Sequence, residues 1–218
     1  MKRKIKKQLK EDEFVSSFSK IFDFAKKWKK EIIAAAVIVA LVAALFGGFQ
    51  LIKAAQVRKD SRTAGEILEL RVDLPKNPQN VARLEQLADR GKFSRLAAIS
   101  LASYWLEQGD LDKAQKALAA VKDIPKDFFY YQAQDLTAQI EILKQSYDRA
   151  VAILKKIEDE KPKDYLLDAV LYRHAEALEK KGDKAGALKL YKRVQEEYMQ
   201  TYFGYDASQK TRKLESEK

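Results

Sequence analysis

The 218-residue sequence contains no cysteine and only one histidine, His174. Without cysteine the chain has no disulfide and no thiol nucleophile, and one histidine cannot build the usual zinc sites or a histidine-paired nucleophile. A glycine-rich loop that would cradle nucleotide phosphates is also missing from the sequence. We therefore expect no enzyme activity, no cofactor and no metal, and we expect His174 to pack between helices.

Glycine and proline are scarce, with 8 and 4 residues, and helix-forming residues dominate the chain. The expected fold class is therefore all-α. The acidic run Glu158, Asp159 and Glu160 is expected to form a solvated helix end, because runs of charge normally lie at the surface.

The net charge of +10 is concentrated near the N-terminus. Residues 1–31 contain eleven basic and five acidic side chains, and residues 53–62 contain four basic and one acidic. The charges of the remaining chain nearly balance, so the phosphate contacts that dominate nucleic-acid affinity have no basic patch to act through. Nucleic acid is not an expected partner.

Residues 32–52, IIAAAVIVALVAALFGGFQLI, contain no charged side chain. At a rise of about 1.5 Å per residue they match a hydrocarbon core roughly 30 Å thick. A cleaved signal peptide would have a shorter apolar run and small residues before the cut. The stretch therefore predicts a single, uncleaved N-terminal transmembrane helix.

The flanks of this span predict its orientation. Eleven lysines and arginines precede it, whereas five lie in residues 53–71. Because basic residues are retained on the cytoplasmic side, we expect a cytoplasmic N-terminus, with residues 53–218 across the membrane.

Residues 1–31 are expected to form a basic cytoplasmic segment. Apolar residues at helical spacing from Phe14 to Trp28 predict an amphipathic helix in the headgroup region, the alternative being a solvated flank needed only for topology. Within the span, small residues recur every four positions and would let another helix approach, although ordinary alanine richness gives the same pattern. They are Ala36, Ala40, Ala44 and Gly48.

Residues 53–91 are expected to form a helical connector or a first hairpin. The helix continues from the span to Arg71 and ends at the prolines of residues 74–78. A short helix follows, with Leu84 and Leu87 on its apolar face and Gly91 closing it.

Residues 92–218 repeat a helical hairpin. Tight turns at residues 108–110, 144–146 and 181–183 are separated by steps of 36 and 37 residues. Each turn is followed at equal distance by a small residue, where the two helices would cross closely, and then by a large one. The small residues are Ala114, Ala150 and Ala187, and the large ones are Leu118, Leu154 and Tyr191.

The spacing resembles tetratricopeptide repeats, whose period is about 34 residues. Residues 109–114 (GDLDKA) and 182–187 (GDKAGA) carry the likeness best, which covers about 92–201, while Thr137 and Glu141 depart from it. The resemblance implies an α-solenoid of tetratricopeptide-like hairpins with a C-terminal capping helix. It also implies a concave groove, formed by the first helices, that binds proteins.

The groove residues implied by the resemblance come from three helices. They are Ile99, Ser103 and Leu106, then Gln132, Asp135, Gln139 and Ile142, then Tyr172, Glu176 and Glu179. The alternative is that about half of them are merely solvated.

As a whole, the order of basic tail, span and repeats resembles the inner-membrane-anchored ancillary subunit of the bacterial Sec translocon. That family implies a periplasmic repeat domain that hands secreted proteins to chaperones. The alternative is a scaffold of another envelope complex, in secretion or motility, which would bind one folded partner or a second copy of itself through residues 202–214.

Overall fold

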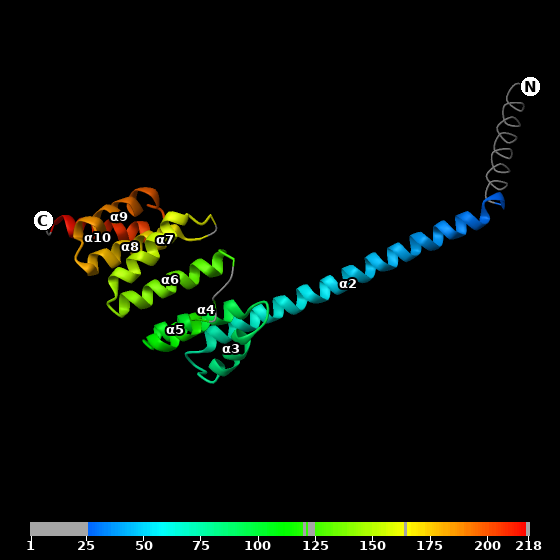
Figure 1. Cartoon of the computed structure of the whole chain (residues 1–218), viewed down its shortest axis with the longest axis horizontal. Helices are drawn as coiled ribbons and strands as arrows, with labels where there is room; N and C mark the ends of the chain where they lie inside the picture. The colour runs from blue at the N-terminus through cyan, green and yellow to red at the C-terminus, as the bar shows by residue number, and fades with distance from the viewer. Residues whose placement is uncertain (1–25, 120, 122–124, 164, 217–218) are drawn as a thin grey trace, which may run out of the picture. The chain divides into compact units, whose positions relative to one another are not determined.

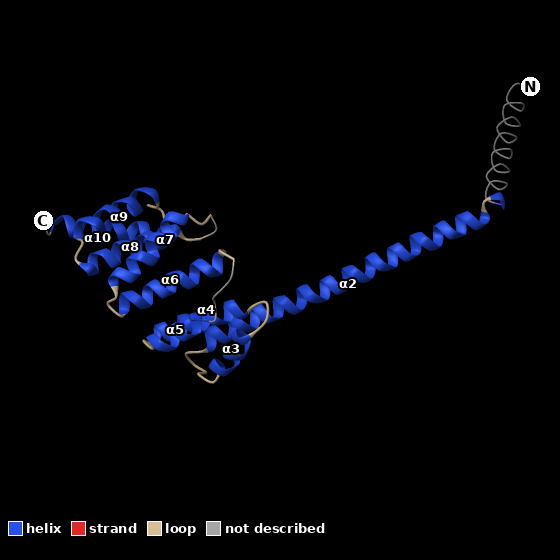
Figure 2. Ribbon diagram, in the orientation of Figure 1, coloured by secondary structure: helices blue, strands red, loops and turns tan. Residues whose placement is uncertain are grey.

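The computed structural model describes residues 26–119, 121, 125–163 and 165–216. Within these residues the secondary structure is helical, without a strand (Figures 1 and 2). The helices are α2 (Lys29–Asp73), α3 (Asn80–Asp89), α4 (Ser94–Glu107), α5 (Leu111–Ala119), α6 (Phe128–Leu143), α7 (Tyr147–Glu160), α8 (Leu167–Lys181), α9 (Lys184–Glu197) and α10 (Tyr202–Ser216). The all-α fold class expected from the composition is confirmed.

The chain divides into two units, Met1–Asp60 and Ser61–Lys218. The first contains the greater part of α2, whose large apolar side chains, such as Leu45 and Phe46, are exposed. By length and composition, Ala40–Asp73 is long and apolar enough to cross a membrane, and its apolar stretch is not buried inside the protein. The amphipathic helix predicted upstream of the span lies mostly outside the described residues.

The second unit begins with the end of α2, so residues 61–91 belong to the same unit as the repeats. Ile67 and Leu74 are fully buried against Leu84 of α3 and Leu101 of α4. The helix ends before Pro75, as the sequence predicted, and the amides of Lys76 and Asn77 donate to the carbonyl of Asp73.

Three hairpins follow: α4 with α5, α6 with α7, and α8 with α9. Their turns use left-handed backbone, with φ of 74° at Gly109 and 95° at Gly182. Gln145, in the turn predicted at residues 144–146, adopts the same region at φ 59°, which is strained for a residue with a side chain.

The predicted crossings between paired helices are confirmed. Ala114, Ala150 and Ala187 have no exposed surface, and the large residues four positions later are buried beside them. The small side chains permit close approach of the helices, and the large ones fill the remaining space.

The C-terminal helix predicted at residues 202–214 is α10, which packs on α8 and α9 through Ala207 and Leu214. Gly204 faces the preceding turn so closely that a Cβ atom would lie 1.9 Å from the carbonyl oxygen of Tyr198. Only glycine permits this approach, which the repeat pattern did not predict.

Candidate functional site

The structure divides the predicted groove residues into buried and accessible ones. Ile99, Ile142 and Tyr172 belong to the hydrophobic cores, and Asp135 is also buried. Neighbouring hairpins cover these four side chains, so the structure does not favour them as a partner-binding surface, and their use by a partner stays a prediction.

Asp135 connects the second and third hairpins. It accepts two hydrogen bonds from Nη1 of Arg173, at 2.9 and 2.7 Å, and one from the Tyr165 hydroxyl at 3.0 Å. Burial raises the pKa of Asp135, while the Arg173 charge and these hydrogen bonds oppose that shift. A buried carboxylate paired in this way holds the hairpins in register, and it offers no oxygen to a ligand.

Two groove residues of α8 bind the protein's own last helix. The Tyr172 hydroxyl donates to Asp206 of α10, and Glu179 accepts hydrogen bonds from Lys210 of α10 and Tyr191 of α9, both at 2.9 Å. Burial would raise the pKa of Glu179, but the Lys210 and Tyr191 hydrogen bonds leave it lowered. The third hairpin's share of the groove is therefore largely used to dock α10.

The remaining groove residues are half-buried, with part of each side chain accessible. They are Ser103 and Leu106 of α4, Gln132 and Gln139 of α6, and Glu176 of α8. Their use by a partner stays a prediction.

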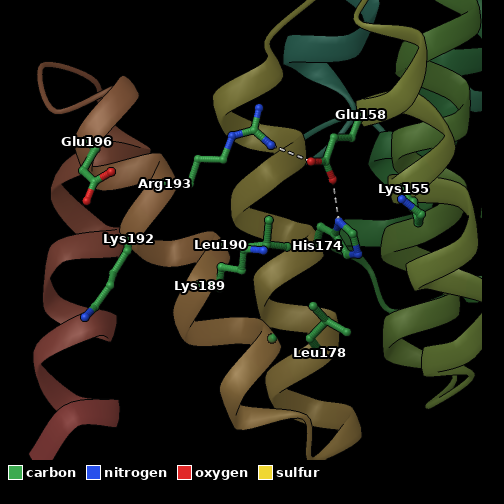
Figure 3. Close-up of a pocket in the computed structure, with 10 residues that line it drawn as sticks. Lys155, Glu158, His174, Leu178, Lys189, Leu190, Lys192, Arg193 and Glu196 are labelled. Atoms are coloured by element: carbon green, nitrogen blue, oxygen red, sulfur yellow. Dashed lines mark hydrogen bonds and ion pairs between the residues drawn. The ribbon is translucent and has the colours of Figure 1, made fainter.

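A second surface surrounds His174 on α8. Its Nδ1 lies 3.0 Å from Oε2 of Glu158 on α7, and the other carboxylate oxygen of Glu158 accepts a hydrogen bond of 2.5 Å from Arg193 on α9 (Figure 3). Burial lowers the pKa of His174, although the Glu158 carboxylate opposes the shift. His174 packs between helices as predicted, with a polar contact to Glu158 that the sequence did not reveal.

The acidic run of α7 is not a solvated helix end, contrary to prediction. Glu158 is mostly covered by His174 and Arg193, and Glu160 accepts hydrogen bonds from Lys126 and from the Tyr131 hydroxyl. Of the three carboxylates, only Asp159 is exposed. The partners of Glu158 and Glu160 lie 16 to 35 residues away in the sequence, beyond the reach of a local charge pattern.

Beside this cluster lies an open groove with a volume of about 600 Å³. The two second helices line it with Lys155 and Glu158 from α7 and with Gly186, Lys189, Leu190, Lys192, Arg193 and Glu196 from α9. His174 and Leu178 of α8 lie between them (Figure 3). We call this surface the α7–α9 groove; it shares no residue with the predicted concave face.

Within the described residues, no three His, Asp or Glu side chains lie together so that they could hold a metal ion. On α2, the side chains of Ala40 and Ala44 are exposed and Gly48 is half-buried, whereas the side chain of Ala36 lies outside the described part. A packing role for this stripe stays a prediction.

Comparison with known proteins identifies the fold family. No curated protein matches the chain. A solved structure of MamA (AMB-1, crystal form P212121) is 21% identical, with a TM-score of 0.45, covering 72% of this chain and 92% of MamA. The model of the tetratricopeptide repeat-like domain matches residues 23–201, so it includes α2 and α3 as well as the three hairpins. The chain belongs to the tetratricopeptide repeat-like domain family.

Proposed function

We propose that the protein is a membrane-tethered adaptor, in which residues 32–52 span the membrane and the unit from Ser61 binds other proteins. The observation that carries this proposal is the contrast within one helix. The apolar side chains of α2 before Asp60 remain exposed, while the unit that follows has cores of its own. An apolar helix without a protein partner is stable in a bilayer.

The charge asymmetry around the span supports a cytoplasmic N-terminus and a repeat unit on the other side, which is the periplasm if the membrane is a bacterial inner membrane. In that compartment an ancillary role at the Sec translocon fits the order of tail, span and repeats. The span would contact the channel, and the repeat unit would contact emerging chains or chaperones.

A second candidate is a scaffold subunit of another envelope complex, such as secretion or motility machinery. It is favoured by apolar side chains exposed at the C-terminal end, where Met199, Tyr202 and Tyr205 are each at least 65% exposed. Exposed aromatic residues are common where a fixed partner or a second copy binds.

Photocrosslinking in living cells distinguishes the two candidates. A photoreactive residue would be placed at Ala40 or Ala44 in the span, at Gln139 on the concave face and at Tyr205 on α10. Adducts of the span with the channel and of Gln139 with varied secretory proteins support the translocon role. One abundant adduct from Tyr205 without a channel adduct supports the scaffold, and no protein adduct from any position contradicts the adaptor proposal.

A further inference from the structure

The floor of the α7–α9 groove is electrically balanced. Glu158 is paired with Arg193, and burial lowers the pKa of His174, which leaves the imidazole neutral at neutral pH. The fixed charge of Glu158 is therefore already compensated within the protein and does not repel an incoming anion.

The rim of the groove is basic. Four cationic side chains line the groove, Lys155, Lys189, Lys192 and Arg193, against two carboxylates, Glu158 and Glu196. Lys155 forms an ion pair with Asp159, and Lys192 forms one with Glu215. Both carboxylates are exposed to solvent. Exposed pairs of this kind contribute little stability, so a ligand carboxylate can replace them at small cost.

Apolar surface lies between these charges. Leu178 and Leu190 line the groove and are only half-buried. Gly186 also lines the groove and has no side chain. A Cβ there would lie 2.5 Å from Oδ2 of Asp183, and Oδ1 of the same carboxylate accepts a hydrogen bond from the Gly186 amide. The groove thus combines positive charge at its rim with an uncovered apolar floor.

From this combination we propose that the α7–α9 groove binds an acidic linear segment of a partner protein, with carboxylates at the lysines and an apolar side chain against Leu178 and Leu190. The inference deepens the proposed adaptor function and rests on it. Phosphate polyanions fit less well, because they would leave the leucines uncovered.

The test measures binding of a fluorescein-labelled peptide, DELDEL, to the full chain in detergent micelles by fluorescence anisotropy. We expect saturable binding that weakens with salt, because its charged contacts are screened. The peptides DEADEA, which lacks the apolar side chain, and KKLKKL, which reverses the charge, should bind at least about tenfold more weakly.

The diagnostic variant is Lys189→Glu combined with Lys192→Gln. We expect it to lower affinity for DELDEL by about tenfold or more. Its matched control is Arg149→Glu with Lys163→Gln, which changes the net charge equally at exposed positions that do not line the groove. Circular dichroism and thermal melting show that each variant remains folded.

The proposal is overturned by absence of saturable binding, by equal losses in the diagnostic and control variants, or by a thymidine oligonucleotide that binds as tightly as DELDEL. None of these readouts requires membrane insertion or the concave face. Loss of peptide binding would therefore overturn the groove proposal without affecting the crosslinking test of the adaptor function. Absence of crosslinks would overturn the adaptor proposal without changing the peptide-binding result.

Discussion

The two parts of α2 differ in what surrounds their apolar side chains. Leu45, in the first unit, is 75% exposed, whereas Ile67, in the second unit, has no exposed surface. Ile67 is covered by α3 and α4, but no part of the described chain covers Leu45. An apolar helix is stabilised by what packs on it, and this difference supports our proposal that residues 32–52 lie in a lipid bilayer.

The largest expected effect comes from breaking the apolar surface of the first part. Leu41→Arg together with Leu45→Arg should disfavour insertion by about 3 kcal/mol for each arginine near the centre of the span. Carbonate extraction of membranes would measure the shift of the protein from the pellet to the soluble or aggregated fraction. The control is Val57→Arg, outside residues 32–52, and equal loss of both proteins from the pellet would contradict the assigned span.

The next effect tests the second part of α2, where adjacent residues face opposite surroundings. Ile67→Ala should lower the free energy of unfolding of the repeat unit by about 2 to 5 kcal/mol, because it leaves a cavity against α3 and α4. Leu68, which is 55% exposed, provides the control, and Leu68→Ala should have little effect. Urea denaturation followed by circular dichroism measures both, and similar losses would show that this end of α2 is not packed on one face.

A smaller effect is expected at Ala150, where α6 packs too closely on α7 to admit a larger side chain. Ala150→Leu should destabilise the second hairpin by about 1 to 3 kcal/mol, because the crossing of α6 and α7 has no room for the added atoms. Lys155→Leu, on the exposed side of α7, should not. Equal changes in melting temperature would mean that Ala150 does not lie at the crossing.

The smallest effect concerns pH. Burial lowers the pKa of His174 below its usual 6.5, so the unfolded chain binds the proton more readily than the folded one. The free energy of unfolding should therefore fall as pH decreases below about 6.5. The charged groups that act on the imidazole are Glu158, Asp159 and Lys155, and Arg193 pairs with Glu158. The effect is measured as the difference in unfolding free energy between pH 7 and pH 5.

The matched variant for pH is His174→Gln, which should lose this part of the pH dependence. Carboxylates with lowered pKa, such as Asp127 and Glu160, weaken only at lower pH. Asp135, whose pKa burial raises, is present in both proteins, so its contribution cancels when the variant is compared with the parent chain. An unchanged slope in the variant would contradict the assignment to His174.

Much of the fold could be predicted because apolar spacing and turn residues are local signals. The hairpin turns, the crossings at Ala114, Ala150 and Ala187 and the helix at residues 202–214 all follow from them. The spacing within one helix shows which face is apolar, but it does not show what the next hairpin covers.

For this reason the contacts made by the candidate site residues could not be predicted from the sequence. Asp135 and Tyr172 are on the first helices as expected, yet Arg173 and Asp206 engage them across hairpins. Glu158 was predicted to be solvated, although Arg193, 35 residues later, pairs with it. The α7–α9 groove could not be predicted at all, because three helices contribute its lining.

We propose that the uncovered part of α2 crosses a membrane and that the repeat unit lies on the side opposite the N-terminus. Protease added to spheroplasts of a bacterial host that expresses the full chain tests it most directly. We expect the unit from Ser61 to be digested while an epitope tag at Met1 stays protected until the membrane is permeabilised. Digestion of the tag with protection of the repeat unit would contradict the orientation, and recovery of the intact chain in the soluble fraction would contradict the span itself.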